Sequence, residues 1–344
     1  MERLLEKLCA LPAVSGFETR GSHALMDLFR AKFEDVREDR LGNVYGYVRC
    51  GQENAPCILL EAHFDMIGLM VKDIDESGFV TFVSIGGVDP RILPGSEVEI
   101  HGKKSIYGVI GMKPPHILST AEQKKAAKLT DLAIDTGFTK EQLEEKIQIG
   151  DPIVMYGPLT YLQNMVCSRS LDNRAGLASV FMAAEELKRN RLQVDICVQA
   201  AVCEETGQQG SRCGAYSVNP DLAIVVDVTH GATPDGQKDR TSPVGEGTVI
   251  CLGPNIHRGH AKQLMQVLER QKVPFGIEVE EGNTGTDAWT IQVVREGIPC
   301  LLLSIPLKYM HTTIETVHKA DIRCTAQAIV EYVRYLSEKR GCGQ

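Results

Sequence analysis

Four short apolar runs in this chain each lead into a histidine or a carboxylate, and this repeated arrangement most restricts the fold. The runs span residues 57–62, 194–203, 222–226 and 301–305. Each has the length of a buried strand, and amphipathic helical patterns lie between and after them, for example at residues 174–188 and 321–339. Strands that alternate with helices predict an α/β fold, in which helices cover both faces of a mostly parallel sheet.

The stretch at residues 68–163 has a different pattern from the rest of the chain. Short alternating segments within it, for example at residues 97–101 and 106–111, are separated by glycine and proline. This pattern predicts a small β-rich, barrel-like domain. Because the stretch holds no cluster of ligand-type side chains, we interpret it as an insertion into an α/β domain formed by residues 1–67 and 164–344.

Local signals predict several further element boundaries. Ser15 and Glu18 form a capping-box pattern, which predicts a helix that starts there and continues to Phe29. The third apolar run is expected to end at Asp227. Additional helices are predicted at residues 140–147, 260–271 and 287–295.

The charge and the apolar content of the chain exclude two classes of partner. The net charge is -8 at pH 7, whereas nucleic-acid binding needs a basic surface that displaces counterions. No apolar run approaches the ~20 residues that cross a bilayer. The charged start of the chain lacks the apolar core and cleavage site of a signal peptide. We therefore expect a cytoplasmic protein that binds neither nucleic acid nor membrane.

The cysteines do not indicate a disulfide framework or a zinc knuckle. Eleven cysteines are scattered along the chain, and no two have the C-x-x-C spacing of a metal or redox motif. Several, including Cys57, Cys197 and Cys300, lie in apolar strand-like runs. We interpret them as small buried side chains in a reducing compartment.

The polar residues beyond the apolar runs are of the types that bind divalent cations. They are His63 and Asp65 after the first run, Glu204 and Glu205 after the second, Asp227 after the third, His311 after the fourth, and Asp172 at the start of a helix. Ligands of open α/β sheets bind beyond the carboxyl ends of strands, so these side chains should meet at one edge. Imidazole and carboxylate ligands favour zinc, manganese or cobalt. A carboxylate such as Asp172 can bridge two ions, which together activate a water and polarise a carbonyl.

The two adjacent glutamates can serve one site only if their strand ends before them, because neighbouring strand residues point to opposite faces. Gly207 follows closely and permits the chain to turn. One carboxylate can then bind metal while the other accepts a proton as general base. Asp65 lies two residues after His63 on the same side of an extended segment, where its carboxylate can accept a hydrogen bond from the ligand imidazole.

Each candidate also has an ordinary structural interpretation. Asp172 could cap its helix, Asp227 could end its strand through local hydrogen bonds, and the adjacent glutamates could form a solvated turn. Several carboxylates at one sheet edge are nevertheless costly without cations, which favours a metal site. The sequence has no G-x-S-x-G elbow and no convincing cysteine–histidine pair, so a nucleophilic enzyme is not favoured.

Seven motifs in this sequence resemble those of the M42 aminopeptidases, which comprise glutamyl aminopeptidases and tetrahedral (TET) peptidases. They are Ala62-His-Phe-Asp-Met-Ile-Gly68, Lys113-Pro-Pro-His116, Leu171-Asp-Asn-Arg-Ala-Gly176, Glu204-Glu-Thr-Gly207, Asp227-Val-Thr-His230, Gly285-Thr-Asp-Ala288 and Tyr309-Met-His311. The resemblance spans nearly the whole chain, with the motifs in the family's order. Two positions depart from the pattern: Met66 is usually acidic in the family, and Asn173 is usually aspartate.

The resemblance implies a two-metal aminopeptidase that acts on short peptides with zinc or cobalt, or with manganese as a further candidate. The implied ligands are Asp172 as the bridge, His63 and Asp227 at one ion, and Glu205 and His311 at the other. The resemblance makes Glu204 the general base and Asp65 the hydrogen-bond partner of the ligand histidine. It also places Thr286 and Asp287 in the substrate site.

The resemblance further implies that the inserted domain serves oligomerisation, since members of the family often assemble as hollow tetrahedral dodecamers. Three other functions were weighed against a peptidase. A glycosidase needs carboxyls that face each other across a glycosidic bond, which the adjacent Glu204 and Glu205 do not easily provide. A deacylase of N-acyl amino acids could use the same two-metal site. A binding protein with an inactive site is disfavoured because every predicted ligand is present.

Overall fold

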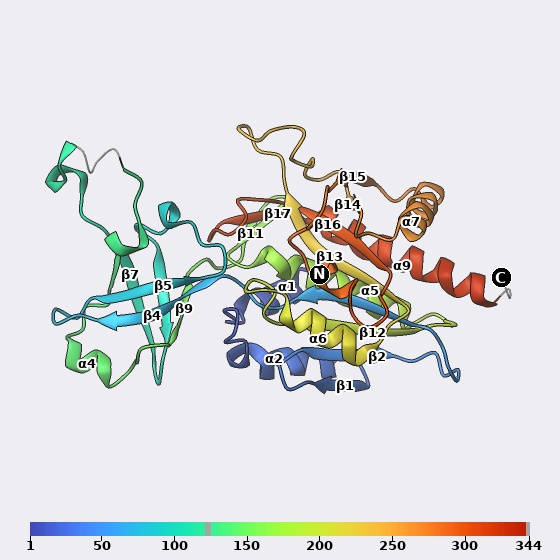
Figure 1. The fold of residues 1–344 in the computed structure, drawn as a ribbon, viewed down its shortest axis with the longest axis horizontal. Coiled ribbons are helices and arrows are strands. Elements are labelled where there is room, and N and C mark those ends of the chain that lie inside the picture. Colours follow the sequence, from blue (N-terminus) through green and yellow to red (C-terminus); the bar gives the residue numbers. More distant parts are fainter. Residues whose placement is uncertain (121–124, 342–344) are drawn as a thin grey trace.

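The computed structural model describes residues 1–120 and 125–341, so four positions of the predicted insertion and the last three of the chain fall outside it. Two sheets organise the described residues (Figure 1). One is a mixed sheet of eleven strands, and the other is a closed antiparallel barrel of six strands. The predicted α/β fold with an inserted barrel-like domain is therefore confirmed.

Four parallel strands form the centre of the large sheet and bring their carboxyl ends to one edge. In sheet order they are β12 (Asp195–Ala201), β3 (Cys57–His63), β13 (Leu222–His230) and β16 (Cys300–Lys308). Nearly all of their residues are buried, as expected for parallel strands covered on both faces. The register sets Ala201 opposite His63, so β12 and β3 end level with each other.

Shorter strands extend this centre on both sides. On one side, β2 (Val44–Val48) pairs antiparallel with β12, and β1 (Asp35–Glu38) pairs with β2. Beyond β16 the sheet continues through β17 (Glu315–His318), β11 (Met165–Ser168) and β10 (Thr160–Leu162). A side branch consists of β14 (Thr248–Leu252), which pairs with β16, and β15 (Phe275–Val279), which pairs with β14.

Helices cover both faces of the large sheet (Figure 1). The chain moves from β3 through α5 (Leu171–Leu187) to β12, and then back through α6 (Gln209–Val218) to β13. Right-handed crossovers in opposite directions place α5 and α6 on opposite faces. On the side of α5, three helices contact it directly: α1 (Glu2–Ala10), α2 (Thr19–Arg30) and α9 (Lys319–Gly341). The helix α7 (Arg258–Gln271) packs against α9 on the same side. The short α8 (Ala288–Ile291) packs against α6.

The inserted barrel has its own apolar core and lies to one side of the α/β domain (Figure 1). Its strands are β4 (Gly68–Ile74), β5 (Val80–Ile85), β6 (Glu97–His101), β7 (Ser105–Gly111), β8 (Ala133–Asp135) and β9 (Pro152–Met155). Its helical segments are α4 (Lys140–Glu144) and the 3-10 turns η1 (Pro90–Ile92), η2 (Pro115–Ile117) and η3 (Leu129–Asp131). Residues alternate strictly between buried and exposed along β7, as the period of two requires.

Several predicted boundaries were wrong. Helix α2 begins at Thr19 without a cap from Ser15, because Glu18 accepts the Gly16 N–H instead. Strand β13 does not end at Asp227 but continues to His230, since its pairing with β16 extends that far. The helix expected at residues 287–295 is only the four-residue α8.

Two further differences concern the insertion. The helix predicted at residues 140–147 ends at Glu144. The strand Thr160–Leu162 falls in the stretch assigned to the insertion, but it pairs with β11 and so belongs to the large sheet. An exposed three-residue strand carries no burial pattern, and its partner can therefore not be chosen from the sequence.

Two predictions from composition can be compared with the structure. The ten cysteines among the described residues are all free, in agreement with a chain that lacks a disulfide framework. No helix in the described ranges is long and apolar enough to cross a membrane. The cytoplasmic location stays a prediction.

Candidate metal centre

The predicted ligands meet at the carboxyl-terminal edge of the central strands. His63 ends β3, Asp227 lies within β13 and Asp172 lies at the start of α5, whereas Glu204, Glu205 and His311 lie on connecting segments. The loop after β12 supplies Glu204 and Glu205, the turn after β16 supplies His311, and the first turn of α5 supplies Asp172. All six line a single cavity of about 270 Å³. Segments far apart in sequence thus form one site, as predicted.

Within this cavity the ligand-type atoms form two groups that share Asp172. The first group is His63, Asp172 and Asp227, and the second is Asp172, Glu205 and His311. In each group the candidate ligand atoms lie within 4.8 Å of one another. Asp172 directs one oxygen to each group: Oδ1 lies 3.2 Å from Nε2 of His63, and Oδ2 lies 3.4 Å from Nε2 of His311. This is the arrangement of a carboxylate that bridges two cations.

The Nδ1 atoms of both histidines face backbone carbonyls, which leaves Nε2 directed to the cluster. Nδ1 of His63 lies 3.2 Å from the carbonyl oxygen of Asp65. Nδ1 of His311 lies 3.1 Å from the carbonyl oxygen of Gly87, in the barrel loop after β5. Donation from Nδ1 fixes the tautomer in which Nε2 is free to bind a metal. The contact of Gly87 was missed from the sequence, because a backbone carbonyl has no residue signature.

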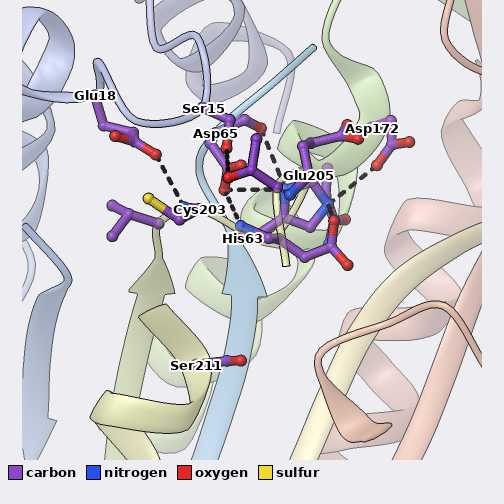
Figure 2. Close-up of polar contacts among 12 residues, drawn as sticks. Ser15, Glu18, His63, Asp65, Asp172, Cys203, Glu205 and Ser211 are labelled. Atoms are coloured by element: carbon purple, nitrogen blue, oxygen red, sulfur yellow. Dashed lines mark hydrogen bonds and ion pairs between the residues drawn. The ribbon is translucent and has the colours of Figure 1, made fainter. Parts of the chain in front are cut away.

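Asp65 contacts other atoms than predicted. Its carboxylate accepts hydrogen bonds from the backbone N–H groups of Glu204 and Glu205, each at 3.0 Å (Figure 2). The carboxylate oxygen nearest to Nδ1 of His63 is 3.7 Å away, and it is the carbonyl of Asp65 that lies within hydrogen-bond distance. The predicted carboxylate–imidazole bond is therefore replaced by one through the backbone, which frees the Asp65 side chain to fix the loop after β12.

Glu315 also holds the backbone of two candidate ligands, and the sequence did not indicate this role. Its side chain is 1% exposed, and it accepts the backbone N–H of Asp172 and that of His311, both at 3.0 Å. His311 has a left-handed backbone, with φ of 60°. Nothing in the sequence around the start of β17 distinguishes this glutamate from a surface residue of an edge strand.

Glu204 is the carboxylate that belongs to neither ligand group. Its Oε2 lies 4.0 Å from Nε2 of His63, and its Oε1 accepts a hydrogen bond of 3.3 Å from the side-chain amide of Gln208. Burial raises the pKa of Glu204 to about 10, and the neighbouring carboxylates of Asp287 and Asp227 add to this rise. This carboxylate is therefore only partly exposed, is held by Gln208, and lies beside the cluster but outside both ligand groups.

The charge of the cavity favours bound cations. Burial opposes ionisation of Asp172, but hydrogen bonds from His311 and His63 lower its pKa overall. Burial raises the pKa of Glu205 and of Asp227; the neighbouring Asp172 carboxylate adds to both rises, whereas His63 opposes them. No lysine or arginine is among the residues that line this cavity. Two imidazoles and several carboxylates therefore fit a pair of divalent cations of the zinc, cobalt or manganese type.

The two predicted substrate residues differ in position. Thr286 lines the cavity. Asp287 is 1% exposed and lies behind the wall, where burial raises its pKa to about 6 beside the fully buried Glu61. Thr286 can therefore touch a substrate directly, whereas Asp287 would act only through the wall of the cavity.

The two positions that depart from the family pattern have structural roles. Asn173 is fully buried, and its side-chain amide donates to the carbonyl of Val226 at 2.7 Å, directly before Asp227. An ionised aspartate at this position could not donate that hydrogen bond. Met66 is buried against Val14 and Val154, where the α/β domain meets the barrel.

Comparisons with known proteins find aminopeptidases. The family described as M42 glutamyl aminopeptidase matches residues 42–327. The lysyl aminopeptidase of Pyrococcus furiosus is 33% identical over 341 residues, which cover 96% of this chain and 97% of that protein.

Two solved structures are similar over nearly the whole chain. A TET aminopeptidase from a marine sediment archaeon of the Thaumarchaeota has a TM-score of 0.92 at 26% identity and covers 99% of both chains. The TET1 peptidase of Pyrococcus horikoshii, which can assemble into a tetrahedron or a large octahedral shell, has a TM-score of 0.84 at 28% identity. That alignment covers 96% of this chain and 98% of the other.

Proposed function

The chain belongs to the M42 glutamyl aminopeptidase family of metal-dependent peptidases, and we propose that it removes N-terminal residues from short peptides at a two-cation centre. The observation that carries this proposal is the sharing of Asp172 between two ligand groups, with Glu204 beside them and outside both. His63 and Asp227 would complete one cation site, and Glu205 and His311 the other. Zinc, cobalt and manganese all suit these ligands.

Glu204 is the residue of this chain that moves the proton. Bound divalent cations supply positive charge that polarises the scissile carbonyl and acidifies the attacking water. Oε2 of Glu204 faces the cluster, while Oε1 is held by Gln208. Bound cations would lower the pKa of Glu204 again, so Oε2 can take the proton from the water as a general base and return it to the leaving amine as a general acid.

The cavity wall supports a preference for basic N-terminal residues. Beyond the ligands, the wall presents Glu278 and Glu280 at the end of β15. Glu278 accepts a hydrogen bond of 2.6 Å from the hydroxyl of Ser304, which fixes one oxygen, and no lysine or arginine of the described residues lines this cavity. A lysine or arginine side chain of the substrate would supply the missing positive charge. The 33% identical lysyl aminopeptidase of Pyrococcus furiosus is consistent with this preference.

The test is a panel of aminoacyl-arylamide substrates, assayed on metal-stripped protein to which zinc, cobalt or manganese is returned. We expect lysyl and arginyl substrates to exceed leucyl and glutamyl ones, and N-blocked substrates to be inert. Glu204→Gln should lower kcat by about 10²- to 10⁴-fold, because it removes the proton acceptor without changing the shape of the side chain. Full activity of Glu204→Gln, or of the metal-stripped protein, would contradict the proposal.

We further propose that the protein forms a homo-oligomer through the barrel, up to a tetrahedral dodecamer. Related TET peptidases assemble into tetrahedral and larger shells. The barrel of this chain exposes apolar side chains on β7, where Tyr107 is 55% and Val109 is 41% exposed. Light scattering after size exclusion would measure the mass, and replacing both residues by lysine should reduce it. A wild-type protein that is monomeric at micromolar concentration would contradict this proposal.

A further inference from the structure

The loop that carries the two adjacent glutamates is held by side chains at four consecutive backbone N–H groups. Oδ1 of Asn43 accepts the N–H of Val202 at 3.0 Å. Oε1 of Glu18 accepts the N–H of Cys203 at 2.9 Å, and Asp65 accepts the next two. Strand β12 has ended at Ala201, so no partner strand is available for these donors. Buried N–H groups without an acceptor are costly, so the loop depends on these side chains for its course.

The conformation of Cys203 explains why both glutamates can reach the site. Its φ is 57°, in the left-handed region that L-residues rarely adopt. This turn breaks the alternation of the strand directly before Glu204 and Glu205. Successive N–H groups then point to the same side, where carboxylates bind them. The left-handed turn at Cys203 therefore sets the directions of both side chains.

Glu18 reaches this turn from a distant part of the chain. It lies directly before α2 and is 6% exposed, and its side chain points to Cys203 (Figure 2). Its Oε1 also accepts the N–H of Gly16 at 2.9 Å. A second contact joins the same segments, since the hydroxyl of Ser15 lies 2.9 Å from that of Thr206. Residues 15–18 are thereby fastened to residues 203–206, the segment that carries both glutamates.

We propose that Glu18 is a positioning residue for the reaction, which fixes the left-handed turn at Cys203 and thereby the placement of Glu204 and Glu205. Glu18 touches neither the ligand groups nor the cavity wall, so its effect must pass through the backbone of the loop. This inference rests on the proposed roles of Glu204 as base and of Glu205 as ligand. Loss of Glu18 should affect the base and the second cation site, and leave the first site intact.

Steady-state kinetics of Glu18→Ala test the effect on the base. We expect kcat to fall by about 10- to 100-fold with little change in KM, because a small displacement of a catalytic group is costly whereas the substrate pocket is unchanged. Glu18→Gln retains an oxygen at the position of Oε1 and should recover most of the activity. If Glu18→Ala fails to fold, Glu18→Asp is used, since its shorter side chain cannot reach the Cys203 N–H and should lower kcat in the same way.

Asp321 provides a matched control. It is fully buried at the start of α9 and accepts two backbone N–H groups, those of Gly245 at 2.7 Å and Gly247 at 2.9 Å. Asp321→Ala should lower the melting temperature about as much as Glu18→Ala but leave kcat unchanged. Equal effects of the two variants on kcat, or wild-type kcat for Glu18→Ala, would overturn the positioning role. Inactivity of the wild-type protein would instead refute the proposed function.

Metal titration gives a readout that does not depend on turnover. When zinc is added to metal-stripped Glu18→Ala, one of the two dissociation constants should rise by about 10- to 100-fold, the range found when groups that orient metal ligands are removed. The other constant should stay near the wild-type value, because no ligand of the first group lies on this loop. If neither constant changes, or both change equally, Glu18 does not act through this loop.

Discussion

The two ligand groups of the metal centre are built on different kinds of backbone. His63 and Asp227 of the first group lie on adjacent central strands, and both are at most 5% exposed. Glu205 and His311 of the second group lie on loops, and the His311 side chain is 30% exposed. The sheet itself positions the first group. The second group depends on carboxylates and a carbonyl that hold the loops, so precision at a loop requires supporting contacts.

Removal of the carboxylate that the two groups share should impair both cation sites at once, and we expect it to have the largest effect on activity. Asp172→Ala takes a ligand from both, so we expect no cation to remain after dialysis and kcat/KM to fall by about 10³-fold or more. Asp227→Asn removes a ligand from the first group only and should leave one cation per chain. Atomic emission measures the metal content of both variants. Two cations retained by Asp172→Ala would contradict the bridging role.

A methyl group at Gly87 should disturb the second group alone. A Cβ at this position would lie 2.7 Å from Nδ1 of His311, so the imidazole must move. We expect Gly87→Ala to raise one of the two zinc dissociation constants by about tenfold, which is within the range found when groups that orient a ligand are removed. Gly111→Ala is the control in the same barrel, since its Cβ would meet only a carbonyl at 3.9 Å. An unchanged titration of Gly87→Ala would show that the barrel does not orient His311.

A smaller effect concerns stability in the absence of metal. Burial raises the pKa of Glu204 from 4.5 to about 10, and raises those of Glu205 and Asp227 as well. Between these pH values the folded metal-free protein holds more protons than the unfolded chain, so its free energy of unfolding falls as the pH rises. The melting temperature in EDTA should drop by about 1–3 °C per pH unit from pH 6 to pH 8.

Bound zinc should remove most of this pH dependence, because cations replace the protons that the carboxylates would otherwise hold. Thermal melts at matched pH, with EDTA or with zinc, make the comparison. A melting temperature in EDTA that rises with pH would show that these carboxylates are not buried together in the folded state.

The same contrast separates what the sequence could predict from what it could not. Apolar runs mark strands, and strand ends meet at one edge, so the first group follows from periodicity and topology. The position of Asp227 within β13 was misjudged, since the last three residues of this strand are set by pairing with β16 and end in the exposed His230. The family resemblance, rather than spacing, assigned Glu204 as the base.

The supporting contacts were not predictable, because one partner in most of them is a backbone N–H or carbonyl group, which nearly every residue has. Glu18 and Ser15 match a helix cap in sequence, yet in the structure they hold the loop after β12. Asp65 was expected at an imidazole and instead binds two backbone N–H groups. The left-handed turn at Cys203 occurs at a residue type that does not favour it, so no local propensity indicates its presence.

The carbonyl of Gly87 gives the barrel a thermodynamic link to the metal centre. His311 takes its orientation from this barrel loop, so a contact that shifts the loop changes the affinity of the second group for its cation. Linkage is reciprocal: a bound cation then changes the equilibrium constant of the contact that shifts the barrel loop by the same factor. With the proposed cation in place, a domain that supplies no ligand would contribute to the free energy of metal binding, and the metal would act as an effector of whatever the barrel binds.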